Sequence, residues 1–299
     1  EASTRDDIRK LPAGTQHGET TFDVPGGEEI TLKVALTVDN ERGEITIDFT
    51  GSSGPSAAGI NVVSAYTHAY STFAIRSILN PELPNNAGSL LPIKVVAPEG
   101  CIVNAKYPSP VNARHVVGMY VPFPILKALA KVVPDKVLAE GSGAVWTIQI
   151  QGRGSDGEPF TSSMFNYSGG MGARADKNGL SATCYPTGVA AVPIEVLEAS
   201  IPIEFTRKEI AEGTGGKGRY TGGNGQYVGF RMRSGNDWLL NALPSRLDSS
   251  AEGLFGAGGG APGQFLINGV ETSESKKLVM QPDDEVLMRT PGGGGSGAV

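Results

Sequence analysis

The sequence predicts an α+β fold, with helices mainly in the first half and a β-rich second half that contains many Gly and Pro turns. Two patterns lead to this prediction. Apolar residues recur at helical spacing over residues 61–79, which contain neither Gly nor Pro. Beyond about residue 140, glycines instead separate short β-branched and aromatic segments. We therefore expect an α+β segment over residues 1–140 and a β-rich segment over residues 141–299.

The first elements of the chain are expected to be a short helix and a β-hairpin. Charged residues over Asp6–Leu11 favour a helix that Pro12 and Gly14 would end. Apolar and polar residues alternate over Glu29–Val38 and again over Glu44–Phe49, on either side of a turn at residues 39–43. This alternation is typical of two antiparallel strands with one buried face.

An amphipathic helix is expected next, over Asn61–Leu79. Asn61 would cap its start, and Asn80-Pro81 would stop it. Two short strands, Pro92–Val96 and Cys101–Asn104, should follow on either side of a Pro-Glu-Gly turn. A second helix is expected over Pro124–Val133, with proline in its first turn.

The second half is expected to form a succession of strands joined by glycine-rich turns. Their predicted ranges are Ala144–Gln151, Pro159–Tyr167, Ile201–Arg207, Gln226–Arg233, Trp238–Leu243 and Glu285–Arg289. Two hairpin-like pieces, Gln264–Val270 and Lys276–Met280, are expected before the last of these.

Composition and charge exclude several classes of protein. With 25 basic and 31 acidic side chains, the formal net charge is −6, which argues against a nucleic-acid partner. No apolar run approaches the ~18 residues of a membrane helix, so we expect no membrane association. Two cysteines in 299 residues make no disulfide framework, and a reducing, cytoplasmic setting is expected. Because residue 1 is Glu and the first methionine is Met119, we expect that the chain was cut, processed or truncated.

The three histidines show no metal-ligand spacing, so no metal site made by this chain alone is expected. His68 falls on the polar face of the predicted helix. His115 follows Asn112-Ala113-Arg114 in a proline-rich segment, where a guanidinium could bind an anion beside a titratable base. A packed or capping histidine next to a surface arginine explains the same residues equally well.

The run from Tyr167 to Arg174 is the second candidate site. Gly169, Gly170 and Gly172 would let backbone amides approach a ligand, and Arg174 offers a guanidinium suited to a carboxylate or phosphate. The run lacks the Gly-Lys-Ser/Thr ending of a phosphate-binding loop, and tight turns use the same spacing. Turns between strands also explain the glycines of residues 213–225 and 256–263.

Six stretches of the sequence, in this order along the chain, resemble one known family. They are Ile47-Asp48-Phe49-Thr50-Gly51-Ser52-Ser53 ahead of Ile60-Asn61, Leu90-Leu91-Pro92-Ile93 with Ala97-Pro98-Glu99-Gly100, Gly169–Arg174, Pro193-Ile194-Glu195-Val196-Leu197-Glu198, Gly215–Gly223, and Thr290-Pro291-Gly292-Gly293-Gly294-Gly295. Together they resemble the hydantoinase B/oxoprolinase family. Its members include subunits of ATP-dependent hydantoinases, 5-oxoprolinases and acetone- and acetophenone-type carboxylases, and the likeness is to their C-terminal part.

The resemblance implies a subunit of a cytoplasmic hetero-oligomer that opens a cyclic amide, such as a hydantoin or lactam. An actin-like ATPase partner of the hydantoinase A type would bind ATP and phosphorylate a carbonyl or enol oxygen of the small-molecule substrate, a cyclic amide or a ketone. The resemblance also implies a divalent metal, zinc or manganese, held by the N-terminal part of the same family, before residue 1. No metal ligand is assigned within this chain.

By the same resemblance, Arg114 and Arg174 would stabilise developing negative charge and His115 would transfer protons, as catalytic residues. Asn112, Gly169, Gly170 and Gly172 would bind the substrate. Two alternatives stay open: a subunit of an acetone/acetophenone-type carboxylase, and a non-catalytic β-rich assembly module. Residues 185–193 replace a Thr-Asn-Thr-Arg-Asn-Thr-Pro-like run found in many oxoprolinase-like members, which counts against 5-oxoproline as the substrate.

Overall fold

The computed structural model describes residues 1–273 and 277–299, with the backbone alone at residues 165 and 166. It shows the predicted α+β chain, in which helices are concentrated early and strands late. The chain forms two compact units. The first comprises residues 1–21, 30–139 and 174–176, and the second comprises residues 22–29, 140–173 and 177–299.

The first unit is built on a four-stranded sheet in the order β1-β2-β3-β4. Its strands are β1 (Gly14–Asp23), β2 (Glu29–Asp39), β3 (Glu44–Asp48) and β4 (Ile93–Val96). The predicted hairpin is confirmed: β2 and β3 are antiparallel with Val38 opposite Ile45, and every second residue of β2 is buried. β4 runs parallel to β3.

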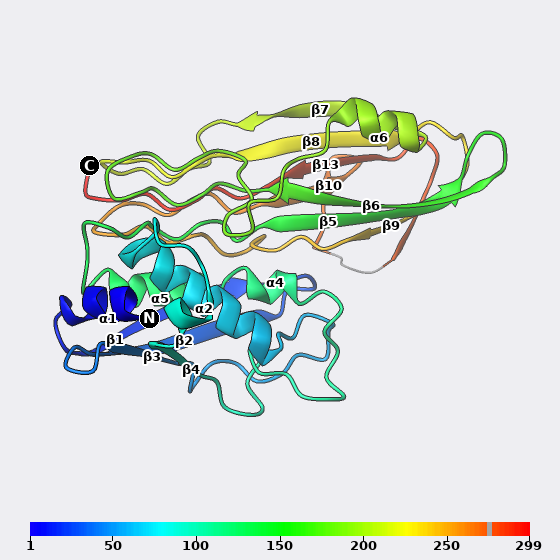
Figure 1. Ribbon diagram of the computed structural model, residues 1–299. Helices are drawn as coiled ribbons and strands as arrows, with labels where there is room; N and C mark the ends of the chain where they lie inside the picture. Colours follow the sequence, from blue (N-terminus) through cyan, green and yellow to red (C-terminus); the bar gives the residue numbers. More distant parts are fainter. Residues whose placement is uncertain (274–276) are drawn as a thin grey trace. The chain divides into compact units, whose positions relative to one another are not determined.

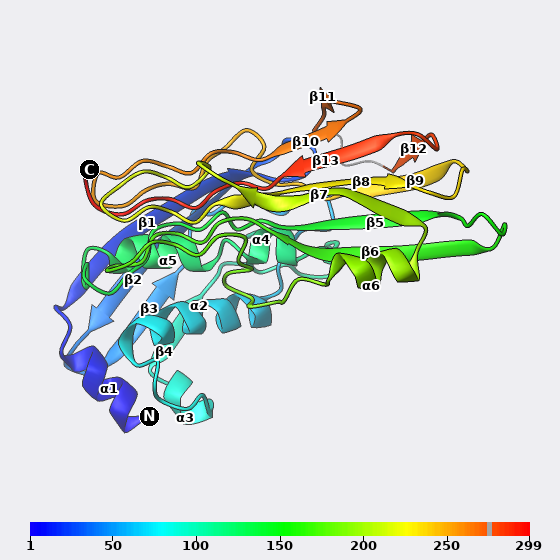
Figure 2. The same ribbon diagram turned by 90° about the horizontal axis from the view of Figure 1, so that it is seen from above.

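Helices cover one face of this sheet, as Figures 1 and 2 show for α2 and α5. The helices of the first unit are α1 (Ala2–Arg9), α2 (Ser64–Leu79), α3 (Ala87–Leu90), α4 (His115–Gly118) and α5 (Pro122–Leu129). Gly18 of β1 lets α5 approach closely, because a Cβ there would lie 1.9 Å from the carbonyl oxygen of Pro124. Lys127 of α5 then donates a hydrogen bond to the carbonyl of Glu19 at 2.9 Å.

Several details of the first half differ from the prediction. Asn61 does not cap α2, whose N-cap is Val63. The segment Cys101–Asn104 is a turn and not a strand, since the amide of Asn104 bonds the carbonyl of Cys101. Its apolar residues Ile102 and Val103 are fully buried, so the apolar run reflects burial without strand pairing. β1 also extends through a charged stretch for which no strand was predicted.

The second unit is a sandwich of two antiparallel sheets (Figure 1). One sheet has the order β11-β10-β13-β8-β7 and the other β12-β9-β5-β6. The strands are β5 (Val145–Arg153), β6 (Pro159–Ser168), β7 (Ile203–Ala211), β8 (Gly225–Met232), β9 (Trp238–Ala242), β10 (Gln264–Ile267), β11 (Val270–Glu271), β12 (Leu278–Met280) and β13 (Glu285–Arg289).

The core of the second unit lies between its two sheets. Trp146 and Trp238 come from one sheet, and Phe230 and Val286 from the other, and all four are buried. The rings of Phe230 and Trp238 lie 6.2 Å apart between their centroids, a distance typical of packed aromatic pairs. This packing joins the two sheets into one core.

The predicted strands of the second half are confirmed in outline. The hairpin-like piece predicted over Gln264–Val270 is confirmed: it contains β10 and the start of β11, which pair with each other through a turn. Helix α6 (Ile194–Ser200) was not predicted. Lys276, the first residue of the second predicted hairpin-like piece, lies outside the described residues, while β12 begins at Leu278.

The glycine-rich segments form a bundle of extended chains, which we call the glycine bundle. It comprises residues 140–142, 169–173, 213–224, 251–263 and 290–297, and Figures 1 and 2 show these traces running side by side toward the C-terminus. The amides of Gly293, Gly294 and Gly295 donate to carbonyls of Gly223, Glu140 and Gly258, which lie on three different neighbouring segments. Successive amides thus bond to three different segments, whereas those of a β-strand alternate between two sides.

Glycine is required in this bundle because the backbones touch. A Cβ at Gly293 would lie 2.2 Å from the carbonyl oxygen of Met171, and one at Gly170 would lie 1.8 Å from that of Gly223. Collagen follows the same packing principle, in which only glycine fits where extended chains meet. The glycines predicted to be turns are therefore mostly packing residues.

Candidate functional site

The segment that carries Asn112, Arg114 and His115 is held by a buried asparagine. Asn61 is fully buried, and its side-chain oxygen accepts from the amide of Ser56 at 2.8 Å. Its side-chain nitrogen donates to the carbonyl of Pro110 at 2.9 Å and to those of Ser56 and Ala58. The amide of Ala113 adds a bond of 2.7 Å to the carbonyl of Gly59. The two segments are therefore fixed against each other.

Sequence reasoning missed this role of Asn61, which it interpreted as a helix cap. The only available signal was the motif position of Ile60-Asn61, because the partner Pro110 is 49 residues away. Gly59 also allows the two segments to lie close together. Its missing side chain leaves room for the amide oxygen of Asn112, which would lie 1.6 Å from a Cβ at that position.

His115 and Arg114 lie at the start of α4, at the end of the fixed segment. Arg114 is the N-cap of α4 and is exposed, and His115 is the first helical residue and is half-buried. Burial lowers the pKa of the His115 imidazole, and the positive charge of Arg114 lowers it further. At neutral pH the imidazole is therefore uncharged and can accept a proton beside a cationic guanidinium.

The other predicted residues lie elsewhere in the chain. Arg174 is half-buried and belongs to the first unit, whereas Gly169, Gly170 and Gly172 belong to the glycine bundle of the second unit. The amides of Gly169 and Gly170 donate to the carbonyls of Ala144 and Pro291, at 3.2 and 2.9 Å. A substrate could bind these two amides only by replacing backbone partners, so their predicted role in substrate binding stays a prediction.

In the part of the chain that the structure describes, the titratable side chains are not arranged as a set of metal ligands. There, no three His, Cys, Asp or Glu side chains come together as a metal site would require. Cys101 and Cys184 are both buried free thiols, and burial raises the pKa of the Cys101 thiol.

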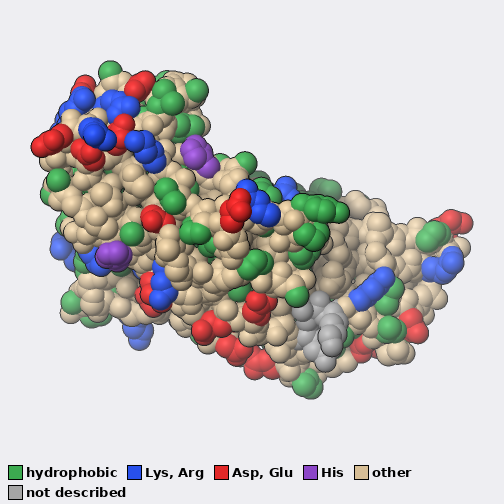
Figure 3. Space-filling model, turned by 90° about the horizontal axis from the view of Figure 1, so that it is seen from below, with side chains coloured by type: hydrophobic (Ala, Val, Ile, Leu, Met, Phe, Trp, Pro, Cys, Tyr) green, Lys and Arg blue, Asp and Glu red, His purple; other side chains and the backbone are tan. Residues whose placement is uncertain are grey.

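The surface mixes both signs of charge. Acidic and basic side chains interleave on the face that Figure 3 shows.

None of the helices within residues 1–273 and 277–299 has both the length and the apolar character that spanning a bilayer demands.

Comparisons with known proteins agree with the family resemblance of the amino-acid sequence. The chain is 31% identical over 273 residues to an uncharacterised protein of Methanocaldococcus jannaschii, covering 89% of this chain and 47% of that protein. Its fold matches a nucleotide-free acetone carboxylase at a TM-score of 0.84 and 17% identity, covering 99% of this chain and 47% of that one.

An ATP-dependent caprolactamase from Pseudomonas jessenii gives the same TM-score of 0.84 at 22% identity, covering 99% of this chain and 54% of the other. The chain thus spans about half the length of each of these three proteins. A sequence profile described as hydantoinase B/oxoprolinase matches residues 1–299. The chain belongs to the hydantoinase B/oxoprolinase family.

Proposed function

We propose that the chain is part of an ATP-dependent enzyme that opens a cyclic amide, such as a hydantoin or lactam. The observation that carries this proposal is the family match over residues 1–299. The likeness to a caprolactamase supports a lactam-type substrate, because that protein's name describes such chemistry on the same fold. Phosphorylation of the amide carbonyl oxygen by ATP would make the carbon a better electrophile and supply a leaving group.

The segment at residues 112–115 suits the step that follows activation. We assign the neutral imidazole of His115 to accept a proton from the attacking water, since its lowered pKa keeps it unprotonated near pH 7. Arg114 and Arg174 would stabilise negative charge on the phosphorylated intermediate and its transition state. Asn112 would orient the substrate, and Asn61 keeps its segment in place.

The remaining components of the proposed enzyme act from outside this chain. An actin-like ATPase subunit of the hydantoinase A type would bind the ATP and transfer its phosphoryl group. A divalent metal, zinc or manganese, would be held by the N-terminal part of the same family and not by the residues described above. The free thiols of Cys101 and Cys184 support a reducing, cytoplasmic location.

The test is ATP-dependent ring opening by the assembled complex, with hydantoin, 5-oxoproline and caprolactam as substrates. Arg114→Ala and Arg174→Ala should each lower kcat/KM by about 10²- to 10³-fold, as expected for loss of a group that stabilises transition-state charge. Arg42→Ala is the matched control, because Arg42 is an exposed arginine in the turn between β2 and β3. Unchanged turnover in both Arg114→Ala and Arg174→Ala would show that the site is assigned wrongly.

A carboxylase subunit is the second candidate, favoured by the likeness to acetone carboxylase. The two functions share the activating phosphorylation but differ in what meets the activated substrate. The same complex should be given ATP, acetone and isotope-labelled bicarbonate in a parallel assay. Label in an acid product would identify a carboxylase, whereas unlabelled ring-opened product from a lactam would identify a hydrolase.

A further inference from the structure

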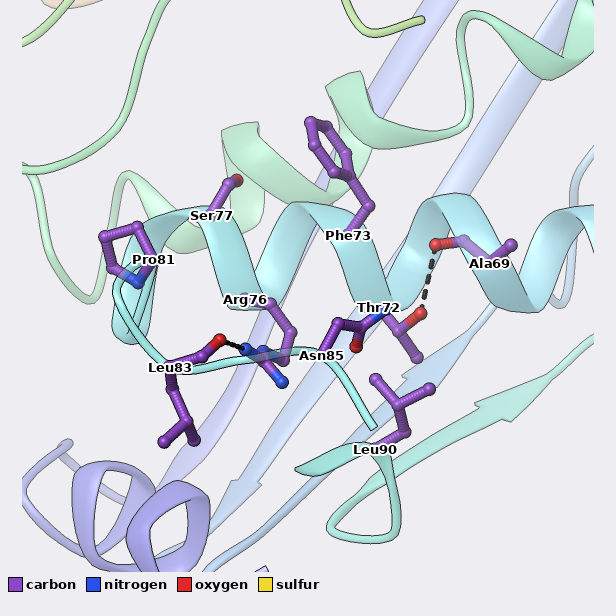
Figure 4. Close-up of a pocket in the computed structure, with 9 residues that line it drawn as sticks. All are labelled: Ala69, Thr72, Phe73, Arg76, Ser77, Pro81, Leu83, Asn85 and Leu90. Carbon is purple, nitrogen blue, oxygen red and sulfur yellow. Dashed lines mark hydrogen bonds between the residues drawn. The ribbon is translucent and has the colours of Figure 1, made fainter. Parts of the chain in front are cut away.

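A cavity of about 470 Å³ lies in the first unit, between the second half of α2 and the loop that leads to α3. Figure 4 shows that its lining residues come from these elements. The size falls in the range of small-molecule sites. The cavity contains none of the residues assigned above to the cyclic-amide chemistry. The residues that matter here are Thr72, Phe73, Arg76 and Ser77 of α2, Asn85 of the loop, and Leu90 of α3.

Arg76 is a buried cation without a carboxylate. The side chain is 8% exposed, and no salt bridge joins it to an acidic side chain within the described residues. One terminal nitrogen, Nη2, donates to the carbonyl of Leu83, as the dashed line in Figure 4 marks. Nε and Nη1 are buried and have no hydrogen-bond partner. Such groups are rare in folded proteins and often mark the place of a bound acceptor.

The neighbours of Arg76 narrow the kind of acceptor. The hydroxyl of Thr72 donates to the carbonyl of Ala69 at 3.0 Å, and that of Ser77 donates to the carbonyl of Ala74 at 3.1 Å. Both hydroxyl hydrogens are therefore used within α2. A phosphate usually needs several further donors, whereas a planar carboxylate can be satisfied by one guanidinium.

The remaining lining favours an apolar body on the ligand. Phe73 is 37% exposed and lies with Leu90 and Pro81 along the cavity. Asn85 is exposed at the same cavity, and the described residues provide no hydrogen-bond partner for its side-chain amide. We propose that this cavity binds a small carboxylate that carries an apolar body, with the carboxylate on Arg76 and the body against Phe73 and Leu90.

The probe is sodium hexanoate, with sodium acetate and hexylammonium chloride as comparisons. Binding is followed through the NMR signal of the Arg76 Nε–H group, which Arg76→Gln assigns by its disappearance. Hexanoate should shift this signal with a Kd of about 1 mM or lower. Acetate should bind about tenfold more weakly, because it lacks the apolar body, and hexylammonium should not bind. Equal affinity for acetate and hexanoate, or no saturation by hexanoate, would overturn the proposal.

Two variants locate the site. Arg76→Gln, followed through the NMR signals of hexanoate itself, should weaken binding at least tenfold, and unchanged binding would contradict the proposal. Asn85→Asp is the second variant, for the case that Arg76→Gln fails to fold. It replaces an exposed side chain by one of the same size and places a negative charge at the cavity, so it should weaken hexanoate binding about threefold or more. Gln151→Glu is the control, because it adds the same charge in the second unit beside Lys277 and should leave the affinity unchanged.

Discussion

At the scale of single residues, the decisive property of His115 is its environment. Burial and the neighbouring charge of Arg114 both disfavour the imidazolium, so the pKa lies below the ordinary value of about 6.5. NMR titration of the imidazole should show this lowered pKa, and Arg114→Ala should move it upward. The replacement Arg42→Ala, in the turn after β2, should not. A His115 pKa that stays the same or falls in Arg114→Ala would contradict the assigned cause.

The same shift makes folding sensitive to acid. Below about pH 6.5 the unfolded chain binds a proton at residue 115 that the folded chain resists, so this group lowers stability as the pH falls. For the proposed reaction, a base with a lowered pKa also keeps its proton-accepting form further into the acid range. The acid limb of kcat/KM should therefore have its midpoint below the ordinary histidine pKa.

The candidate residues show what sequence reasoning can reach at this scale. Arg114 and His115 are adjacent in the chain, so their proximity could be predicted from the sequence. Asn61 could not be assigned correctly, because its role depends on a carbonyl 49 residues away. Arg76 drew no attention in the sequence, since the property that marks it, two buried guanidinium nitrogens without hydrogen-bond partners, exists only in three dimensions.

At the scale of elements, the glycine bundle depends on direct contact between backbones. A Cβ at Gly293 would lie 2.2 Å from the carbonyl oxygen of Met171, where no flexible side chain can move aside. Gly293→Ala should therefore lower the free energy of unfolding by about 3 kcal/mol, through overpacking. Urea unfolding, followed by the fluorescence of the buried tryptophans, measures this change.

Gly258 provides a control inside the same bundle. A Cβ there would lie 3.4 Å from the carbonyl oxygen of Lys217, which is ordinary contact. Gly258→Ala should therefore change stability by no more than about 1 kcal/mol. If the two alanine variants were equally stable, the glycines would not be needed for packing, and their interpretation as turns would be restored.

Secondary structure could be predicted where a periodic pattern extends over many residues. The hairpin of β2 and β3, helix α2 and the strands of the sandwich all carry such patterns. The glycine bundle carries none, because its successive amides bond to several different segments and do not alternate between two sides. Short helices such as α4 and α6 are also missing from the prediction, since four to seven residues give too little periodicity.

At the scale of the whole chain, polar contacts join segments that are far apart in sequence. The side chain of Asp23 accepts from the amide of Leu247 at 2.8 Å, and the amide of Arg246 donates to the carbonyl of Asp23. Arg246 in turn pairs with Glu140. All of these residues belong to the second unit, which residues 22–29 join from the first half of the chain. Sequence reasoning could not foresee this network, because its contacts join residues that are over 100 positions apart.

The ion pair in this network is buried, and its loss should be costly. The side chains of Arg246 and Glu140 are 0% and 1% exposed. Glu140→Gln keeps the shape but removes the negative charge of this buried pair, which should lower the free energy of unfolding by about 3–5 kcal/mol. Glu209→Gln is the control: its partner is Arg207, Glu209 is 54% exposed, and the change should cost less than about 1 kcal/mol. Equal losses in these two variants would mean that the buried pair holds residues 140 and 246 together no more strongly than a surface contact does.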